Sequence, residues 1–148
     1  MSDQIIRKGT NSLELPDFPN PAFHRPPPLA EATVALVTSA GLQREGDKIW
    51  SGGDESFRVF ASDERDLTFS QMSNNFDRSG IAADFNVAYP IDRLEELAAE
   101  GTIGAVAPRH LSFMGALQTV STIISDTGIA AAKQLRDDGV DIVVLTPV

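Results

Sequence analysis

Small polar residues and one histidine directly follow three apolar segments of the sequence. They are Thr38, Ser39 and Gly41 after residues 32–37, His110 and Ser112 after residues 103–107, and Thr146 and Pro147 after residues 142–145. Apolar runs of this kind are typical of strands that are buried on both faces of a parallel sheet. Ligands of such sheets bind beyond the carboxyl ends of the strands, so we expect a site where Thr146 and Pro147 lie.

His110 is the side chain of this set that is best suited to proton transfer. An imidazole with a pKa near neutrality exchanges protons or orients a substrate carboxylate, and Ser112 would share its face of an extended segment. The alternative is a loop histidine that hydrogen-bonds a carbonyl oxygen and has no catalytic role. We expect no zinc site, because one histidine without cysteine partners cannot form it. We expect no hydrolase triad, because no serine lies in a Gly-x-Ser-x-Gly segment.

Two other segments carry groups that could bind a small anion. The turn at residues 38–41 would let backbone amides approach a phosphate or carboxylate, although a plain turn explains the same residues. The polar segment 73–80 contains Asn75 and Arg78, and a solvated turn with local side-chain hydrogen bonds is its alternative. Both pairs of alternatives stay open.

The elements that must position these residues follow a regular order. Residues 90–100 and 118–137 carry apolar residues at three- and four-residue steps and are predicted to be helices. Three short strand candidates, residues 48–50, 57–60 and 66–71, form an excursion at the edge of the sheet. Together with the three buried strands, these elements predict an α/β fold with an open, mainly parallel, Rossmann-like sheet flanked by helices.

The chain divides into two parts. Residues 1–31 are rich in proline and are predicted to form an N-terminal arm that lies over the body or over a partner subunit, or else a disordered tail. Residues 32–148 are expected to be the N-terminal part of a single α/β domain. Because the buried strand at residues 142–145 has no helix after it, we expect the sheet to be incomplete at the C-terminus.

Composition argues against several classes of function. The 12 basic and 21 acidic residues give a net charge of −9, which disfavours binding to a nucleic acid backbone. No apolar run approaches the ~20 residues of a membrane span and no signal peptide is recognisable, so we expect a cytoplasmic protein without membrane contact. The 148 residues include no cysteine and therefore supply no thiol nucleophile and no disulfide.

Five segments of the chain share a pattern with one protein family. They are residues 32–41 (ATVALVTSAG), 75–78 (NFDR), 84–94 (DFNVAYPIDRL), 110–115 (HLSFMG) and 139–148 (GVDIVVLTPV). Over these segments, from about residue 32 to residue 148, the chain resembles the glycine/sarcosine/betaine reductase selenoprotein B family, including its smaller bacterial members. Five segments in the same order are more specific than any one of them.

The resemblance implies chemistry that composition leaves open. Members of that family use a selenocysteine or cysteine as nucleophile in the reductive cleavage of a carbon–nitrogen bond of glycine-type substrates. A partner reductase subunit and a thioredoxin-type electron donor complete the reaction. In the family the last segment continues into the nucleophile, which we therefore expect directly after Val148. Relatives often carry a histidine where this chain has Gln71.

The resemblance also implies which residues surround a small amino-acid-like or carboxylate substrate. His110 and Ser112 would line the pocket as catalytic residues. Candidate substrate-binding residues are Thr38, Ser39, Gly41, Asn75, Arg78, Arg109, Met114, Thr146 and Pro147. Arg78 and Arg109 are chosen by residue type alone, because an arginine pairs well with a carboxylate. The chain itself is expected to hold no cofactor and no metal.

Three functional hypotheses follow. In the first, the chain is a truncated and inactive portion of a selenocysteine- or cysteine-dependent reductase, and a UGA codon for selenocysteine follows Val148. In the second, it is a non-catalytic small-acid-binding or assembly module, alone or as a homo-oligomer. In the third, the full-length protein is a two-thiol racemase or lyase, which consumes no electrons.

Overall fold

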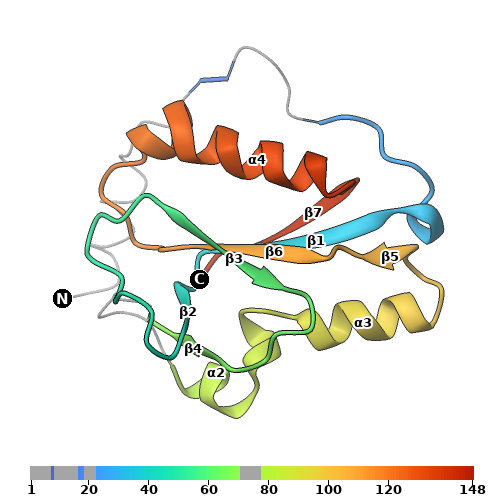
Figure 1. Ribbon diagram of the computed structural model, residues 1–148, viewed down its shortest axis with the longest axis horizontal. Coiled ribbons are helices and arrows are strands. Elements are labelled where there is room, and N and C mark those ends of the chain that lie inside the picture. Colours follow the sequence, from blue (N-terminus) through green and yellow to red (C-terminus); the bar gives the residue numbers. More distant parts are fainter. Residues whose placement is uncertain (1–7, 9–16, 19–22, 71–77) are drawn as a thin grey trace.

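The computed structural model describes residues 8, 17–18, 23–70 and 78–148, which form a mixed α/β structure around a curled, mostly parallel sheet (Figure 1). The strands are β1 (Thr33–Thr38), β2 (Leu42–Arg44), β3 (Phe57–Ala61), β4 (Leu67–Phe69), β5 (Ala105–Val106), β6 (Arg109–Phe113) and β7 (Ile142–Thr146). The helices are η1 (Leu29–Glu31), α2 (Ser79–Ala83), η2 (Phe85–Val87), α3 (Ile91–Ala99), the π-helical segment η3 (Ile123–Thr127) and α4 (Gly128–Asp137). The predicted α/β class and the mostly parallel sheet are confirmed.

β1 is the central strand and has parallel neighbours on both sides. On one side it pairs with β7 along nearly its whole length, from Val34 opposite Ile142 to Thr38 opposite Thr146. On the other side it pairs first with β5 and then with β6, and β3 runs antiparallel to β6 beyond it. Residues 34–36 of β1 are all buried, as expected of a strand whose two faces are both covered.

Helices cover the two faces of the sheet (Figure 1). α4 lies over one face, where its Leu135 shares an apolar cluster with Leu111 of β6. α3 lies against the opposite face, where its Leu94 shares a second cluster with Leu36 of β1. The antiparallel pair of β2 and β4 lies on the same side as α3. The core therefore consists of two apolar layers with β1 and β6 between them.

Both predicted helices are present. The predicted helix 90–100 is α3, and Gly101, with φ of 73°, follows its end in the left-handed conformation. The predicted helix 118–137 contains η3 and continues as α4. Gly128 permits the π-helical turn, because a Cβ atom there would lie 2.4 Å from the carbonyl oxygen of Ile123. No helix in the described residues has the length and apolar character that a membrane span requires.

Residues 48–50, predicted to be a strand, are not one, because Trp50 turns into the core. Its indole Nε1 donates a 3.0 Å hydrogen bond to the carbonyl oxygen of Leu42, in the unpredicted strand β2. The guanidinium of Arg58 lies 4.1 Å from the centre of the indole ring. Burial of one large aromatic side chain thus outweighs the local strand pattern.

The strand predicted at residues 103–107 is reduced to the two residues of β5. The following segment, expected to extend beyond the strand end, forms β6 instead and includes both His110 and Ser112. Pro108 separates the two strands, because proline has no N–H to donate to the ladder. His110 and Ser112 therefore lie inside the sheet.

β7 is a parallel strand as predicted, but the expectation that both of its faces are buried is wrong. Val143, Val144 and Leu145 are 38%, 36% and 70% exposed, because β7 is the outermost strand on its side of the described sheet. Most of the predicted arm, residues 1–7, 9–16 and 19–22, lies outside the described residues.

Candidate functional site

A small, open pocket of about 180 Å³ lies where the carboxyl ends of β1, β6 and β7 meet. It is lined by Val37, Thr38, Ser39, Phe113, Leu145, Thr146 and Pro147. Four candidate substrate-binding residues thus surround one cavity. They are Thr38 and Ser39 at the end of β1, and Thr146 and Pro147 at the end of β7. The parallel register explains this, since it sets Thr38 directly opposite Thr146.

The threonine hydroxyls at the base of this pocket are engaged in structural hydrogen bonds. Thr38 Oγ1 and Thr146 Oγ1 each donate a 3.0 Å hydrogen bond to the carbonyl oxygen of Ala88. Thr38 Oγ1 also accepts a 3.2 Å hydrogen bond from the N–H of Ala40. Ala40 forms an isolated β-bridge with Met114, which is buried. These hydroxyls hold the ends of β1 and β7 together and are not available as free donors to a ligand.

Ser39 and Gly41 connect the turn after β1 to both neighbouring strands. The Ser39 N–H donates a 3.2 Å hydrogen bond to the Thr146 carbonyl, and Ser39 Oγ accepts a 2.9 Å hydrogen bond from the N–H of Val148. Gly41 has φ of 65°, which suits glycine, and its N–H donates a 2.9 Å hydrogen bond to the Phe113 carbonyl. The turn is therefore fixed at the pocket by main-chain bonds.

His110 and Ser112 lie behind the pocket and do not line it. Both are fully buried on the face of β6 that is directed toward α3. His110 Nδ1 accepts a 3.0 Å hydrogen bond from the Leu36 N–H, so the ring proton is on Nε2. Ser112 Oγ accepts a 2.9 Å hydrogen bond from the Leu42 N–H. Each side chain satisfies a backbone donor that the sheet leaves unpaired.

The environment of His110 keeps its imidazole neutral. Burial lowers the pKa of His110 to about 4, the positive charge of Arg65 acts in the same direction, and Glu95 opposes it. The ring of Tyr89 meets it edge-on at 5.9 Å between ring centres. Neither His110 Nε2 nor the Tyr89 hydroxyl has a hydrogen-bond partner among the described residues. A histidine in this state is a poor proton acceptor near neutral pH.

The two candidate arginines lie elsewhere. Arg109 begins β6 and pairs with Asp138, to which its Nε donates a 2.9 Å hydrogen bond. It is four residues from Phe113 at the pocket, a distance of about 13 Å along a strand. Arg78 is exposed and immediately precedes α2. Asn75 lies outside the described residues.

Glu55 is a structural feature at this edge of the sheet that sequence reasoning missed. Its carboxylate accepts hydrogen bonds from the Thr122 N–H at 2.6 Å and from the Ile123 N–H at 3.1 Å. Burial would raise the pKa of Glu55, but these bonds and one from the Thr119 hydroxyl outweigh it and lower the pKa. No local pattern signals this contact, because Glu55 is more than 60 positions away from its partners.

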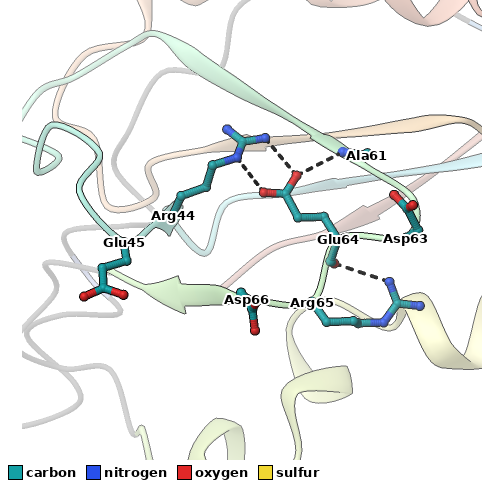
Figure 2. Close-up of a pocket in the computed structure, with 7 residues that line it drawn as sticks. All are labelled: Arg44, Glu45, Ala61, Asp63, Glu64, Arg65 and Asp66. Carbon is teal, nitrogen blue, oxygen red and sulfur yellow. Dashed lines mark hydrogen bonds and ion pairs between the residues drawn. The ribbon is translucent and has the colours of Figure 1, made fainter.

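A second, larger cavity of about 580 Å³ is drawn in Figure 2. It is lined by Arg44, Glu45, Ala61, Asp63, Glu64, Arg65 and Asp66. Arg44 Nη2 donates a 2.8 Å hydrogen bond to Glu64, and Arg65 Nη2 donates one of 2.7 Å to Glu95. Both guanidinium groups are thus paired, and the remaining carboxylates make the cavity unsuitable for an anionic substrate. Ala61 lies opposite Arg109, at the amino end of β6. This cavity is therefore away from the carboxyl ends of the parallel strands, where the first pocket lies.

Comparison with known proteins identifies relatives of the chain. The family model described as glycine/sarcosine/betaine reductase selenoprotein B matches residues 10–148. The D-proline reductase subunit gamma of Acetoanaerobium sticklandii is 37% identical over 99% of this chain and 62% of its own length. The glycine reductase complex component B subunit gamma of Carboxydothermus hydrogenoformans is 33% identical over 97% of the chain and 36% of its own length. No solved structure matches the chain.

A third relative, the sarcosine reductase complex component B subunit beta of Peptoclostridium acidaminophilum, is 28% identical over 97% of the chain and 36% of its own length. The chain therefore spans less than two thirds of each of these curated relatives. Two of them are named as subunits of multi-subunit reductase complexes.

Proposed function

Because the chain belongs to the glycine/sarcosine/betaine reductase selenoprotein B family, we propose that it forms the substrate-pocket portion of a selenocysteine- or cysteine-dependent reductase. The observation that carries this proposal is the pocket at the carboxyl ends of β1, β6 and β7. The carboxyl ends of parallel strands are where a ligand of an open α/β sheet is expected. The pocket volume of about 180 Å³ suits a small amino-acid-like substrate.

The proposed reaction is the reductive cleavage of a carbon–nitrogen bond. A thiolate or selenolate attacks the carbon, the carbon–nitrogen bond breaks, and the amine leaves with its electron pair and a proton. A second thiol then attacks the sulfur or selenium of the adduct, and the carbon fragment leaves and takes up a proton. The disulfide or selenenylsulfide that results is restored by two electrons from a thioredoxin-type donor. Both reactive groups must come from outside these 148 residues, which contain no cysteine.

Several of the described residues have a defined place in this proposal. Phe113 and Leu145 supply apolar walls, and Ser39 lies at the rim. His110 and Ser112 act by positioning β1 and its turn, since both bind backbone amides behind the pocket. Arg78 and Arg109 are candidates for binding a substrate carboxylate by residue type alone, and Arg109 lies at the far end of β6, where it pairs with Asp138.

The proposal also covers the location of the chain and the subunits with which it acts. The chain works with at least one partner reductase subunit, in line with the names of its relatives. Its proposed location is the cytoplasm. Alone, the chain binds substrate and turns nothing over. A racemase or lyase would require two thiols but no electron donor, so electron consumption separates it from the proposed reductase.

A chimera tests the proposal. This chain replaces the matched part of the D-proline reductase subunit gamma, the chimera is assembled with the other subunits of that enzyme, and reduction of D-proline, glycine, sarcosine and betaine is followed with dithiothreitol as donor. We expect at least one of them to be reduced by the chimera and none by the 148-residue chain. Leu145→Trp should fill the pocket and abolish turnover, whereas Ile49→Trp, at an exposed position away from the pocket, should retain it. Turnover by the 148-residue chain, or a folded chimera without turnover, would overturn the proposal.

A further inference from the structure

The outer edge of β7 is unpaired in the described part of the chain and lacks the features that protect an edge strand. Its inner edge pairs with β1, and its residues 143–145 are exposed and apolar. No charged residue lies between Ile142 and Val148. Natural edge strands avoid unwanted pairing with charged side chains, bulges or a covering loop, and β7 has none of these among the described residues.

The opposite edge of the sheet shows the contrast. β3 carries Arg58, whose guanidinium lies 4.1 Å from the ring centre of Trp50 and donates to the carbonyl of Lys48. Asp47 lies within 3.5 Å of the same guanidinium. A charged side chain and the segment 47–50 thus cover β3. Among the described residues, β3 is therefore a protected edge strand, whereas β7 is an exposed, apolar one.

β7 exposes apolar side chains on both of its faces. Val143 pairs with Ala35, which belongs to the apolar cluster on the α4 side. Val144 pairs with Leu36, which belongs to the cluster on the α3 side. A strand that is apolar on both faces is typical of the interior of a parallel sheet, where helices cover both faces. A segment that pairs with this edge would therefore have to bring a strand and cover for both faces.

A second copy of this chain fits that requirement poorly. A twofold axis through the edge would pair β7 with its own copy in antiparallel orientation. It would also bring together two chains that each carry a net charge of −9. The curated relatives indicate a different occupant. The match covers 62% of the D-proline reductase subunit gamma and leaves the other 38% of its length outside.

We propose that the outer edge of β7 binds a parallel β-strand from a polypeptide segment equivalent to the part of the D-proline reductase subunit gamma that the match leaves out. The identity of this occupant rests on the proposed function, whereas the open edge does not. In parallel pairing, the carboxyl end of the new strand lies beside Leu145 and Pro147. The docked segment would thus close the open side of the pocket and bring its own side chains to it.

Co-refolding of the 148-residue chain with that segment of the D-proline reductase subunit gamma tests the inference. Complex formation is measured by analytical ultracentrifugation, and amide exchange is measured residue by residue. We expect a one-to-one complex in which the amides of β7 exchange at least tenfold more slowly, while those of β3 are unchanged. Val143→Lys and Val144→Lys, one on each face, should each weaken binding at least tenfold.

Ile49→Lys is the matched control, because Ile49 is an exposed apolar residue near the protected edge and should leave binding unchanged. Circular dichroism of each variant shows whether it folds, and a variant that does not fold is replaced by its threonine counterpart. A refolded chain that does not bind the segment, or a complex in which β7 still exchanges rapidly, would disprove the inference. So would a dimer of the chain alone that protects β7. None of these readouts depends on turnover, so they are separate from the test of function.

Discussion

His110 Nδ1 accepts a hydrogen bond of 3.0 Å from the Leu36 amide and thereby completes the ladder between β1 and β6. Backbone pairing on that side of β1 involves residues 33–34 with β5 and residues 37–38 with β6, which leaves Leu36 between them. The carbonyl of Pro108 accepts a 3.0 Å hydrogen bond from the N–H of Ser62. The imidazole thus replaces a main-chain acceptor in the centre of the sheet.

His110→Phe should destabilise the fold by about 1–3 kcal/mol, because it fills the same space and leaves the buried Leu36 N–H without an acceptor. Urea unfolding measures the free energy. Exchange of the Leu36 amide should also accelerate relative to that of Val34. A His110→Phe variant with unchanged stability would show that this bond contributes nothing.

Stability should fall as the pH is lowered from 6.5 to 4. The unfolded chain protonates His110 below its ordinary pKa of 6.5, whereas burial delays protonation in the folded chain to about 4. The unfolded state thus binds more protons in this window, and the free energy of unfolding decreases by about 3 kcal/mol across it. Urea titrations at several pH values measure this slope.

His110→Phe should remove the slope between pH 6.5 and 4.5, since it removes the titrating group. Buried or hydrogen-bonded carboxyl groups such as Glu55 lose their contribution only at lower pH, because the pKa of Glu55 is below its ordinary value. A slope of equal size in the variant would assign the effect to other groups.

Tyr89→Phe should change the free energy of unfolding by about 0.5 kcal/mol or less. The Tyr89 hydroxyl is buried without a protein partner among the described residues, so its removal breaks no hydrogen bond within the described chain. Tyr89→Ala, by contrast, should cost about 3–5 kcal/mol, because it leaves a large cavity between β6 and α3. A cost above about 1 kcal/mol for Tyr89→Phe would reveal a hydrogen-bonded water at this hydroxyl.

Thr38→Val should be more damaging than Thr146→Val, although both remove a hydrogen bond to the Ala88 carbonyl. Thr38→Val also leaves the buried Ala40 N–H without its acceptor, at a cost of about 1–3 kcal/mol. Thr146→Val leaves the Ala88 carbonyl bonded to Thr38 and should cost about 1 kcal/mol or less. Chemical denaturation of the two variants and of the double variant measures the difference, and equal costs would contradict the shared role of Ala88.

Local sequence was sufficient to predict the elements whose side chains all favour the same environment. The apolar runs of β1 and β7, and the helical stripe and terminal Gly101 of α3, predict these elements and the parallel α/β sheet. The placement of Thr38 and Thr146 at one strand edge follows from the same pattern, since parallel strands end together. The resemblance in five short segments supplied the family, which no composition argument could reach.

Tertiary structure alone decided which of these residues are occupied in holding the fold. The sequence pattern suggested His110 and Ser112 as reactive groups, but in the folded chain they accept hydrogen bonds from the amides of Leu36 and Leu42. Glu55 and Ala88 carry no local signal, and each gains its role from partners far along the chain. The physical reason is that a buried donor or acceptor must be satisfied by whatever group lies within about 3 Å of it, and only the folded chain determines which group that is.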